Sequence, residues 1–455
     1  MHGTLLNICT GSLVILLLAG CTLRPAGDER PTPAPYAPKV AAASIAPVDL
    51  PAYKFTKIDA IVEEAIREMA TPGAVVMVLK DGKTVFARAY GHHTYAGEVP
   101  TKTSDIFDLA SLTKIFATTL ATMRLVEEGK LDLGSTVGAY LDELKRSHPE
   151  KAAIVVRDLL THEAGLVPFI PFYRQLKEGD VSTEPLLQYP VKVADRFYLR
   201  RNYYEDVMRK QMLNSPMQPR GKYVYSDIGM YLLQEILQRI TGQPLDVYVD
   251  EQFYQPLGAR SIGFRPLERF ASERIVPTEE DGYFRKQLLK GYVQDPGAAM
   301  TGGVAGHAGL FASAGDLALL SQMLLNGGSM NGRQFIRPET VKLFTSRQSA
   351  ENRRGLGFDC WDPEAKEGYP CTLASSAIFG HTGYTGTCVW IDPQHQLVYI
   401  FLSNRLYPSP DKAKLQKLKI RPRIQDAIYE AIGIDSKPAT SAAQRGRLPV
   451  IAPGW

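Results

Sequence analysis

Two strand–turn–strand patterns, one near each end of the chain, constrain the fold more than any other feature of the sequence. Residues 73–91 (GAVVMVLKDGKTVFARAYG) predict a β-hairpin with a tight turn at Asp81-Gly82, and residues 385–404 (TGTCVWIDPQHQLVYIFLSN) repeat the pattern. A helical pattern flanks each of them. Before the first, apolar residues recur at helical spacing at Ile58, Ile61, Val62, Ala65, Ile66 and Met69, and after the second the stretch RIQDAIYEAIG is helical in pattern. The chain between them is mostly helical or loop-like. We therefore expect an α+β fold, with an antiparallel sheet built from both chain ends, flanking helices and a mostly helical lobe. A cleft between the sheet and that lobe is the natural place for a site.

The motif S-x-x-K occurs twice, and its surroundings separate the two copies. Ser111 and Lys114 begin a run of apolar residues at helical spacing that stops at Gly129, whereas Ser409 to Lys412 (SPDK) contains proline and precedes no such run. Ser111 is thus expected in the first turn of a helix, where backbone N–H groups favour a developing anion. Burial would lower the pKa of Lys114 from ~10.4 and let it accept a proton from a serine hydroxyl. The alternative is a serine cap followed by a solvated lysine.

Two further stretches could contribute to the same cleft. Tyr225, Ser226 and Asp227 come immediately before an amphipathic helical run, and GHTGYTGT (residues 380–387) opens a predicted strand with small residues. Small residues let a substrate backbone lie against a strand edge, and the strand can offer an N–H group to an oxyanion. The alternatives are an aromatic residue before an ordinary cap, and a glycine-rich strand entry without chemistry.

In this order the three motifs resemble the serine β-lactamase and penicillin-binding protein superfamily, whose marks are S-x-x-K, then Y-x-N or S-D-N, then K-T-G. The tyrosine form resembles the class C branch, and residues 125–144, 157–166 and 302–320 look like framework segments of it. The resemblance extends over residues 53–434 and includes the 4B type of penicillin-binding protein. It implies that Ser111 attacks a carbonyl while Lys114 and Tyr225 handle its proton. The backbone amides of Ser111 and Tyr384 would form the oxyanion hole. The implied substrate-binding residues are Asp227, His381, Thr382, Gly383 and Tyr384.

Two residues depart from the family pattern. Asp227 stands where asparagine is usual, and an ionised aspartate cannot donate to a substrate carbonyl. His381 stands where lysine is usual. With a reference pKa of ~6.5, histidine would hold a substrate carboxylate only as it gains charge near or below that pH.

The resemblance implies a periplasm-facing serine hydrolase, with D-Ala-D-Ala carboxypeptidase activity on peptidoglycan peptides as the leading hypothesis. A β-lactamase or esterase on the same fold is an alternative, and a catalytically silent peptidoglycan-binding protein is another. We expect no cofactor or metal, because His162-Glu163 lacks the second histidine of H-E-x-x-H, and His307 is interpreted as structural. The net charge of +4 does not favour nucleic acid as a partner.

The N-terminal region predicts a membrane anchor. Residues 1–20 resemble a lipoprotein signal peptide that ends in LAG before Cys21, which would be lipidated. Residues 21–52 form a Pro/Ala-rich tether, 53–434 the hydrolase domain and 435–455 a low-complexity tail. Family habit at Thr22 implies the outer membrane, with the domain facing the periplasm; a plain cleaved signal or a misplaced start is the alternative. The remaining cysteines, Cys360, Cys371 and Cys388, allow either a Cys360–Cys371 disulfide or three free thiols.

Overall fold

The computed structural model describes residues 52–410 and 413–434. The predicted signal peptide with Cys21, the tether, the tail and Lys412 of the second S-x-x-K therefore lie outside the described residues. In the part that is described, no helix is both long enough and apolar enough to cross a membrane.

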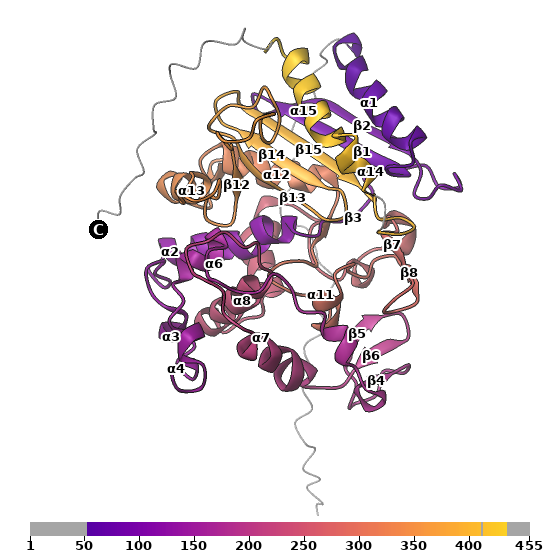
Figure 1. Cartoon of the computed structure of the whole chain (residues 1–455). Coiled ribbons are helices and arrows are strands. Elements are labelled where there is room, and N and C mark those ends of the chain that lie inside the picture. The colour runs from indigo at the N-terminus through magenta and orange to yellow at the C-terminus, as the bar shows by residue number, and fades with distance from the viewer. Residues whose placement is uncertain (1–51, 411–412, 435–455) are drawn as a thin grey trace, which may run out of the picture. The chain divides into compact units, whose positions relative to one another are not determined.

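The centre of the fold is a six-stranded antiparallel sheet in the order β12-β13-β14-β15-β1-β2 (Figure 1). Its strands are β1 (Gly73–Lys80), β2 (Lys83–Gly91), β12 (Asp359–Cys360), β13 (Phe379–Thr382), β14 (Cys388–Asp392) and β15 (Leu397–Ser403). The first and last of the long strands are neighbours, since β1 pairs with β15 from Ala74 opposite Ser403 to Lys80 opposite Leu397. This confirms the prediction that both chain ends build one antiparallel sheet.

The β1–β2 hairpin forms at the predicted turn. Asp81 and Gly82 both have positive φ, 51° and 73°, as a two-residue turn between right-twisted strands requires. The central strands β1, β14 and β15 alternate between two buried faces. Val75, Val389 and Ile400 belong to the core shared with the helical lobe, whereas neighbouring residues such as Val76, Trp390 and Phe401 face the opposite core.

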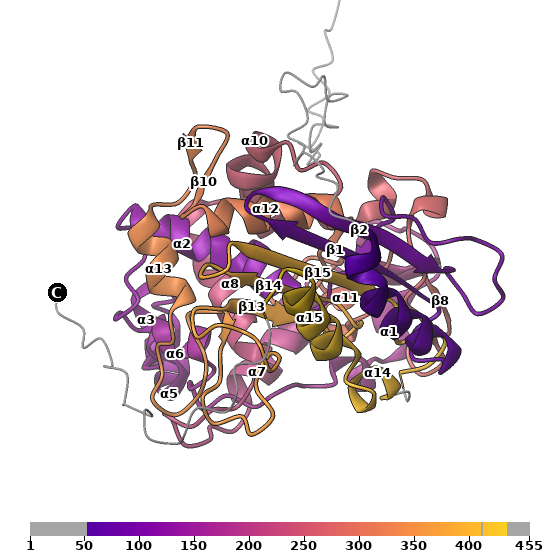
Figure 2. The ribbon, with the colours of Figure 1, turned by 90° about the horizontal axis from the view of Figure 1, so that it is seen from above.

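Helices from both chain ends cover the outer face. The helices α1 (Thr56–Arg67) and α15 (Ile420–Ala431) pack against each other over the sheet, as Figures 1 and 2 show. The predicted periodicity holds for Ile58, Ile61, Val62 and Ala65, which are buried. It fails at Met69, which lies beyond the helix with φ 56° and is 42% exposed. On the inner face, α12 (Ala314–Leu325) contacts β1, β14 and β15.

The middle of the chain forms the other lobe. Its helices are α2 (Leu120–Glu127), α3 (Val137–Tyr140), α4 (Leu144–Ser147), α5 (Pro149–Ala152), α6 (Val156–Thr161), α7 (Lys210–Asn214), α8 (Ile228–Thr241), α9 (Leu245–Val249), α10 (Gln255–Leu257), α11 (Pro296–Met300) and α13 (Pro338–Thr345), whereas the short helix α14 (Lys414–Lys417) packs with α15 on the outer face of the main sheet. The lobe also contains small sheets that the sequence did not predict. Their strands are β3 (Phe107–Asp108) with β9 (Phe311–Ala312), β4 (Val181–Ser182) with β6 (Phe197–Leu199) and β5 (Val191–Ala194), β7 (Glu279–Asp281) with β8 (Gln287–Leu289), and β10 (Ser329–Met330) with β11 (Arg333–Gln334). These strands are only two to four residues long, too short to show a periodic pattern in the sequence.

Cys360, Cys371 and Cys388 are all buried free thiols. Of the two alternatives for the described cysteines, the structure shows free thiols and no Cys360–Cys371 disulfide.

Candidate active site

Ser111 lies in a tight turn between the short strand β3 and the helical run that follows it. Ala110, which precedes Ser111, has φ 47°, a backbone conformation that a non-glycine residue rarely adopts. The turn is fixed by Asp108, whose buried carboxylate accepts hydrogen bonds from the Ala110 amide at 2.9 Å and the Gln294 amide at 2.7 Å. Burial raises the pKa of Asp108 to about 6, against the opposing effect of these hydrogen bonds. The strained turn presents Ser111 at the mouth of the helix.

Lys114 lies one turn further on and is fully buried. It begins a π-helical segment, η2 (Lys114–Thr119), which continues as α2 and stops at Gly129 with φ 68°. Its Nζ donates to Ser111 Oγ at 3.0 Å, to Asp227 Oδ1 at 2.8 Å and to the His307 carbonyl at 3.3 Å.

Tyr225 approaches Ser111 from the segment before α8. Its hydroxyl donates to Ser111 Oγ at 2.9 Å, and Lys114 Nζ lies 4.8 Å from the centre of its ring. The structure therefore brings together the three residues that the sequence predicted as catalytic, from segments more than 100 positions apart.

The structure corrects one expectation about Lys114. Burial acts to lower the pKa of Lys114, as expected, but the Asp227 carboxylate and Tyr225 outweigh it, and the pKa is raised. Lys114 is therefore an ammonium ion in the resting enzyme. Sequence reasoning placed Asp227 against the substrate, whereas its carboxylate is ion-paired with Lys114.

The segment after β13 packs directly against the serine turn. Thr385 Oγ1 donates to the Asp108 carbonyl at 2.7 Å, and Thr387 Oγ1 donates to the Leu109 carbonyl at 3.2 Å. A Cβ atom on Gly383 would lie 2.1 Å from Thr387 Oγ1 and 2.5 Å from the Leu109 carbonyl oxygen, so this position has no room for a side chain. The small residues of GHTGYTGT are thus required by close packing as well as by any substrate.

The edge of β13 is open beside the site. The neighbouring strand β12 pairs only with Phe379 and Gly380, so from His381 onward no strand is paired with β13 on this side. Tyr384 follows with 54% of its surface exposed. Among the described residues, neither the Ser111 amide nor the Tyr384 amide donates a hydrogen bond. Both amides are thus available, and the oxyanion hole stays a prediction.

His381 differs from the sequence-based expectation. It is only 3% exposed, its Nδ1–H donates to the Thr382 carbonyl at 2.7 Å, and its Nε2 accepts from Arg354 Nη1 at 3.0 Å. Burial and the adjacent Arg354 guanidinium lower the pKa of His381 to about 3. This lowered pKa opposes the expectation that His381 becomes charged between pH ~8 and ~6, which stays a prediction for measurement.

Two buried residues beside Tyr225 had no role in the sequence-based site. Arg354 lies in the loop between α13 and β12, with its guanidinium 5.3 Å from the centre of the Tyr225 ring. The ring of His162 lies 4.5 Å from that of Tyr225, and its Nδ1 accepts from the Ser226 amide. Burial and three nearby cationic or imidazole groups hold the pKa of His162 well below its usual value. His162 had been weighed only as half of a zinc motif, and Arg354 carries no motif.

An acidic cluster closes the other side of Lys114. Asp227, Asp295 and His307 have ligand-type atoms within 4.8 Å of one another, an arrangement that could hold a metal ion. However, the Lys114 ammonium already neutralises Asp227, and His307 Nε2 is 2.9 Å from Asp295 Oδ1. The pKa of Asp295 is about 2: burial acts to raise it, but His307 and the Asp295 hydrogen bonds prevail. These partners favour a charge-balanced hydrolase site over a metal centre.

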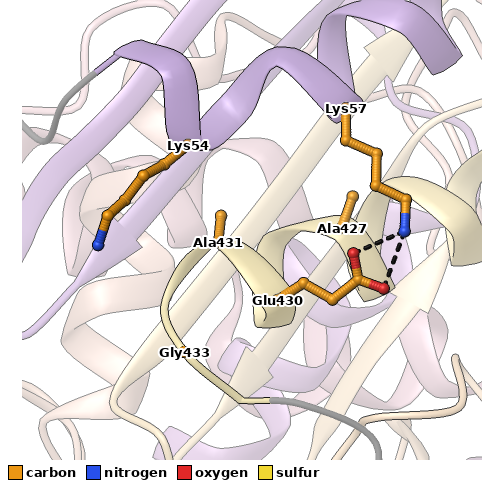
Figure 3. Close-up of a pocket in the computed structure, with 6 residues that line it drawn as sticks. All are labelled: Lys54, Lys57, Ala427, Glu430, Ala431 and Gly433. Atoms are coloured by element: carbon orange, nitrogen blue, oxygen red, sulfur yellow. Dashed lines mark hydrogen bonds and ion pairs between the residues drawn. The ribbon is translucent and has the colours of Figure 1, made fainter.

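A surface pocket elsewhere does not belong to this site. It lies between η1 (Ala52–Phe55), the start of α1 and the end of α15, where Lys57 Nζ contacts the two carboxylate oxygens of Glu430 at 2.8 and 2.6 Å (Figure 3). These elements cover the sheet face opposite the core that holds the serine turn.

Comparisons with known proteins agree with this geometry. A family model described as Beta-lactamase matches residues 58–420. An N-acetylmuramyl-L-alanine amidase from Bacillus subtilis is 35% identical over 376 residues, which cover 77% of this chain and 81% of the relative. A protein of Escherichia coli K12 named "Putative D-alanyl-D-alanine carboxypeptidase" is 34% identical over 363 residues, covering 74% and 79%.

The same fold is found among solved structures. The penicillin-binding protein homologue from Pyrococcus abyssi superposes with a TM-score of 0.59 at 20% identity, covering 83% of this chain and 77% of that one. At this identity the likeness concerns the fold alone.

Proposed function

Because this chain belongs to the β-lactamase family and is a serine hydrolase, we propose that it cleaves amide bonds of peptidoglycan peptides through an acyl-enzyme at Ser111. The leading substrate bond is D-Ala-D-Ala, which would make it a carboxypeptidase. One observation carries the proposal: Ser111 Oγ is within hydrogen-bond distance of both Lys114 Nζ and the Tyr225 hydroxyl.

The charges of the site suggest how the proton moves. Lys114 is an ammonium ion and has no free electron pair, so Tyr225 relays the proton: its oxygen accepts the Ser111 proton while its own hydroxyl proton passes to the nitrogen of the scissile amide. Ser111 Oγ then forms a bond to the substrate carbonyl carbon. The Lys114 ammonium stabilises the negative charge that develops on Ser111 Oγ and on the Tyr225 oxygen. The relayed proton completes the leaving amine as the C–N bond breaks, and Tyr225 is again a hydroxyl. Water, activated by the same tyrosine, hydrolyses the ester and regenerates Ser111.

The acyl-enzyme can be tested with a fluorescent penicillin, intact mass and peptide mapping. We expect one adduct, on Ser111, none in Ser111→Ala, and much slower labelling in Lys114→Ala. Ser226 is the internal control, because its hydroxyl is committed to the Val167 carbonyl at 2.7 Å. An adduct on any other residue contradicts the proposal. Rapid penicillin turnover without a persistent adduct would instead identify a β-lactamase.

A second substrate bond is favoured by the state of His381. A D-Ala-D-Ala substrate carries a carboxylate next to the scissile bond, and a neutral His381 offers it no charge. The amide between N-acetylmuramic acid and L-alanine has no such carboxylate when the peptide continues, and a relative is named for hydrolysing it. A muramyl pentapeptide separates the two reactions in one assay, since the first releases D-alanine and the second releases a peptide with a free N-terminus. If D-alanine is released, Arg405, 4.6 Å from the Tyr384 ring, is the candidate partner for the carboxylate.

We also propose that the enzyme is an outer-membrane lipoprotein that faces the periplasm, anchored by a lipidated Cys21. The apolar stretch ending in LAGC supports this. Cys21→Ser should release the protein from membranes, and unchanged membrane fractionation of that variant would exclude the anchor.

A further inference from the structure

Arg354 is a buried arginine whose guanidinium lies close to the ring of the proposed catalytic residue Tyr225. It is 3% exposed, and its two terminal nitrogens make different contacts: Nη1 donates to His381 Nε2 at 3.0 Å, and Nη2 donates to the Tyr223 hydroxyl at 3.0 Å. Its guanidinium lies 5.6 Å from the centre of the Tyr223 ring and 5.3 Å from that of Tyr225. Arginine side chains are almost never buried to this extent unless their charge is paired.

The charge of Arg354 is only partly compensated. Asp359 Oδ1 lies 3.5 Å from Arg354 Nε, but the same carboxylate is closer to Arg353, at 2.8 Å. Arg353 also lies 3.9 Å from Asp362. Two guanidinium groups thus share the buried Asp359, and the excess positive charge lies on the Arg354 side, toward Tyr225.

His381 links Arg354 to strand β13 through its two ring nitrogens. Because its Nδ1–H donates to the Thr382 carbonyl, its Nε2 carries the lone pair that receives Arg354. His381 is therefore held neutral in one tautomer, and the fixed cation of this region is Arg354.

We propose that Arg354 is a positioning residue that supplies, through His381 and against the Tyr225 ring, the permanent positive charge that the family motif K-T-G places on the strand itself. The inference rests on the proposed function in one respect, that Ser111 is the nucleophile whose acylation is measured. The charge lies 5.3 Å from the centre of the Tyr225 ring, where it stabilises the negative charge that develops on the Tyr225 oxygen while the Ser111 proton is relayed. A guanidinium suits this role, because it never loses its proton and its planar fork holds His381 and Tyr223 at once.

A double-substitution cycle tests the proposal, with acylation of Ser111 by an uncharged nitrophenyl ester as the readout. Arg354→Met should lower the acylation rate by ~100-fold. His381→Lys alone should also impair it, because it places a second cation beside the guanidinium. Combining His381→Lys with Arg354→Met should restore at least ~10-fold of the lost rate, since the charge then returns to the strand.

Arg353→Met is the matched control. It removes the neighbouring guanidinium and its contacts with Asp359 and Tyr369, but none of its contacts involves His381 or Tyr225. Because Arg353→Met leaves Asp359 to Arg354 alone, we expect a lower melting temperature and an acylation rate reduced by less than ~10-fold, well short of the effect of Arg354→Met. Arg354→Lys covers the case in which Arg354→Met does not fold: a retained cation should keep acylation within ~10-fold of wild type.

The outcomes separate this inference from the proposed function. If the wild-type enzyme forms no ester adduct on Ser111, both fall. If the wild type reacts and Arg353→Met loses as much activity as Arg354→Met, Arg354 is merely structural. A folded double variant that is no faster than Arg354→Met overturns the inference equally, because it shows that the charge does not act.

Discussion

The pKa of His381 gives the sharpest prediction about the site. With a pKa of about 3, about one His381 side chain in a thousand is charged at pH ~6, and far fewer at pH ~8. An ordinary histidine would change from about 3% to about 76% charged over that range, roughly 25-fold. The preference of the enzyme for a carboxylate-bearing substrate over its uncharged ester should therefore change by less than ~2-fold between these pH values.

The assay is the ratio of kcat/KM for a depsipeptide with a free C-terminal carboxylate to that for its methyl ester. The ratio cancels the titration of Lys114, which acts on both substrates alike. His381→Gln is the matched control, because the glutamine carbonyl can still accept from Arg354 but cannot titrate. Its ratio should have the same flat profile. Among the 8 histidines of the chain, the difference spectrum between wild type and this variant assigns the His381 resonances for direct titration by NMR.

A wild-type ratio that rises ~10-fold or more toward pH ~6, and loses that rise in His381→Gln, would refute the reasoning. It would show that the imidazole becomes charged despite its burial and despite the neighbouring guanidinium. The contact with Arg354 would then have to open in solution.

Three further predictions concern the same region. Asp227→Asn leaves only Tyr225 to oppose the effect of burial on Lys114, so the pKa of Lys114 should fall and acylation should be lost at a lower alkaline pH than in wild type, as kcat/KM profiles would show. Gly383→Ala should lower the free energy of unfolding by ~1–3 kcal/mol and slow acylation, whereas Gly282→Ala, with nothing within 4 Å of its added methyl group, should do neither. The lowered pKa of His381 contributes stability above pH ~6.5 that is lost as pH falls toward about 3. The free energy of unfolding, measured with urea, should therefore depend on pH less steeply in His381→Gln than in wild type, by ~1.4 kcal/mol per pH unit over this range. An unchanged slope would contradict the lowered pKa.

The sheet could be predicted from the sequence because its long strands carry periodic signals of their own. The alternation and the Asp81-Gly82 turn predicted the first hairpin, and regular apolar spacing predicted α1 up to Arg67. The continuation to Met69 was wrong because an apolar residue just after a helix end matches the period without sharing its backbone conformation. The small sheets of the other lobe, such as β4-β6-β5, were beyond prediction, since strands this short are fixed by tertiary pairing.

The site was predictable where a motif places residues on one element and unpredictable where the fold brings distant segments together. Ser111 and Lys114 lie one turn apart, so their proximity follows from helical geometry. The pKa of Lys114 depends on Asp227, 113 positions away, and burial alone gave the wrong direction. Arg354 has no motif and reaches His381 only through the loop before β12.

The two departures from the family pattern make physical sense together. Relative to asparagine and lysine, Asp227 and a neutral His381 each lower the formal charge of the site by one. Arg354 returns a positive charge from outside the motif, and the carboxylate of Asp227 keeps Lys114 protonated. It follows that restoring the family residue at either position alone should harm the enzyme. Lysine at position 381 would place a second cation beside the Arg354 guanidinium, and asparagine at position 227 would leave the buried Lys114 ammonium without its carboxylate partner. Chains of this family with histidine in the third motif should therefore be compared by where their buried arginines lie, and not by the motif alone.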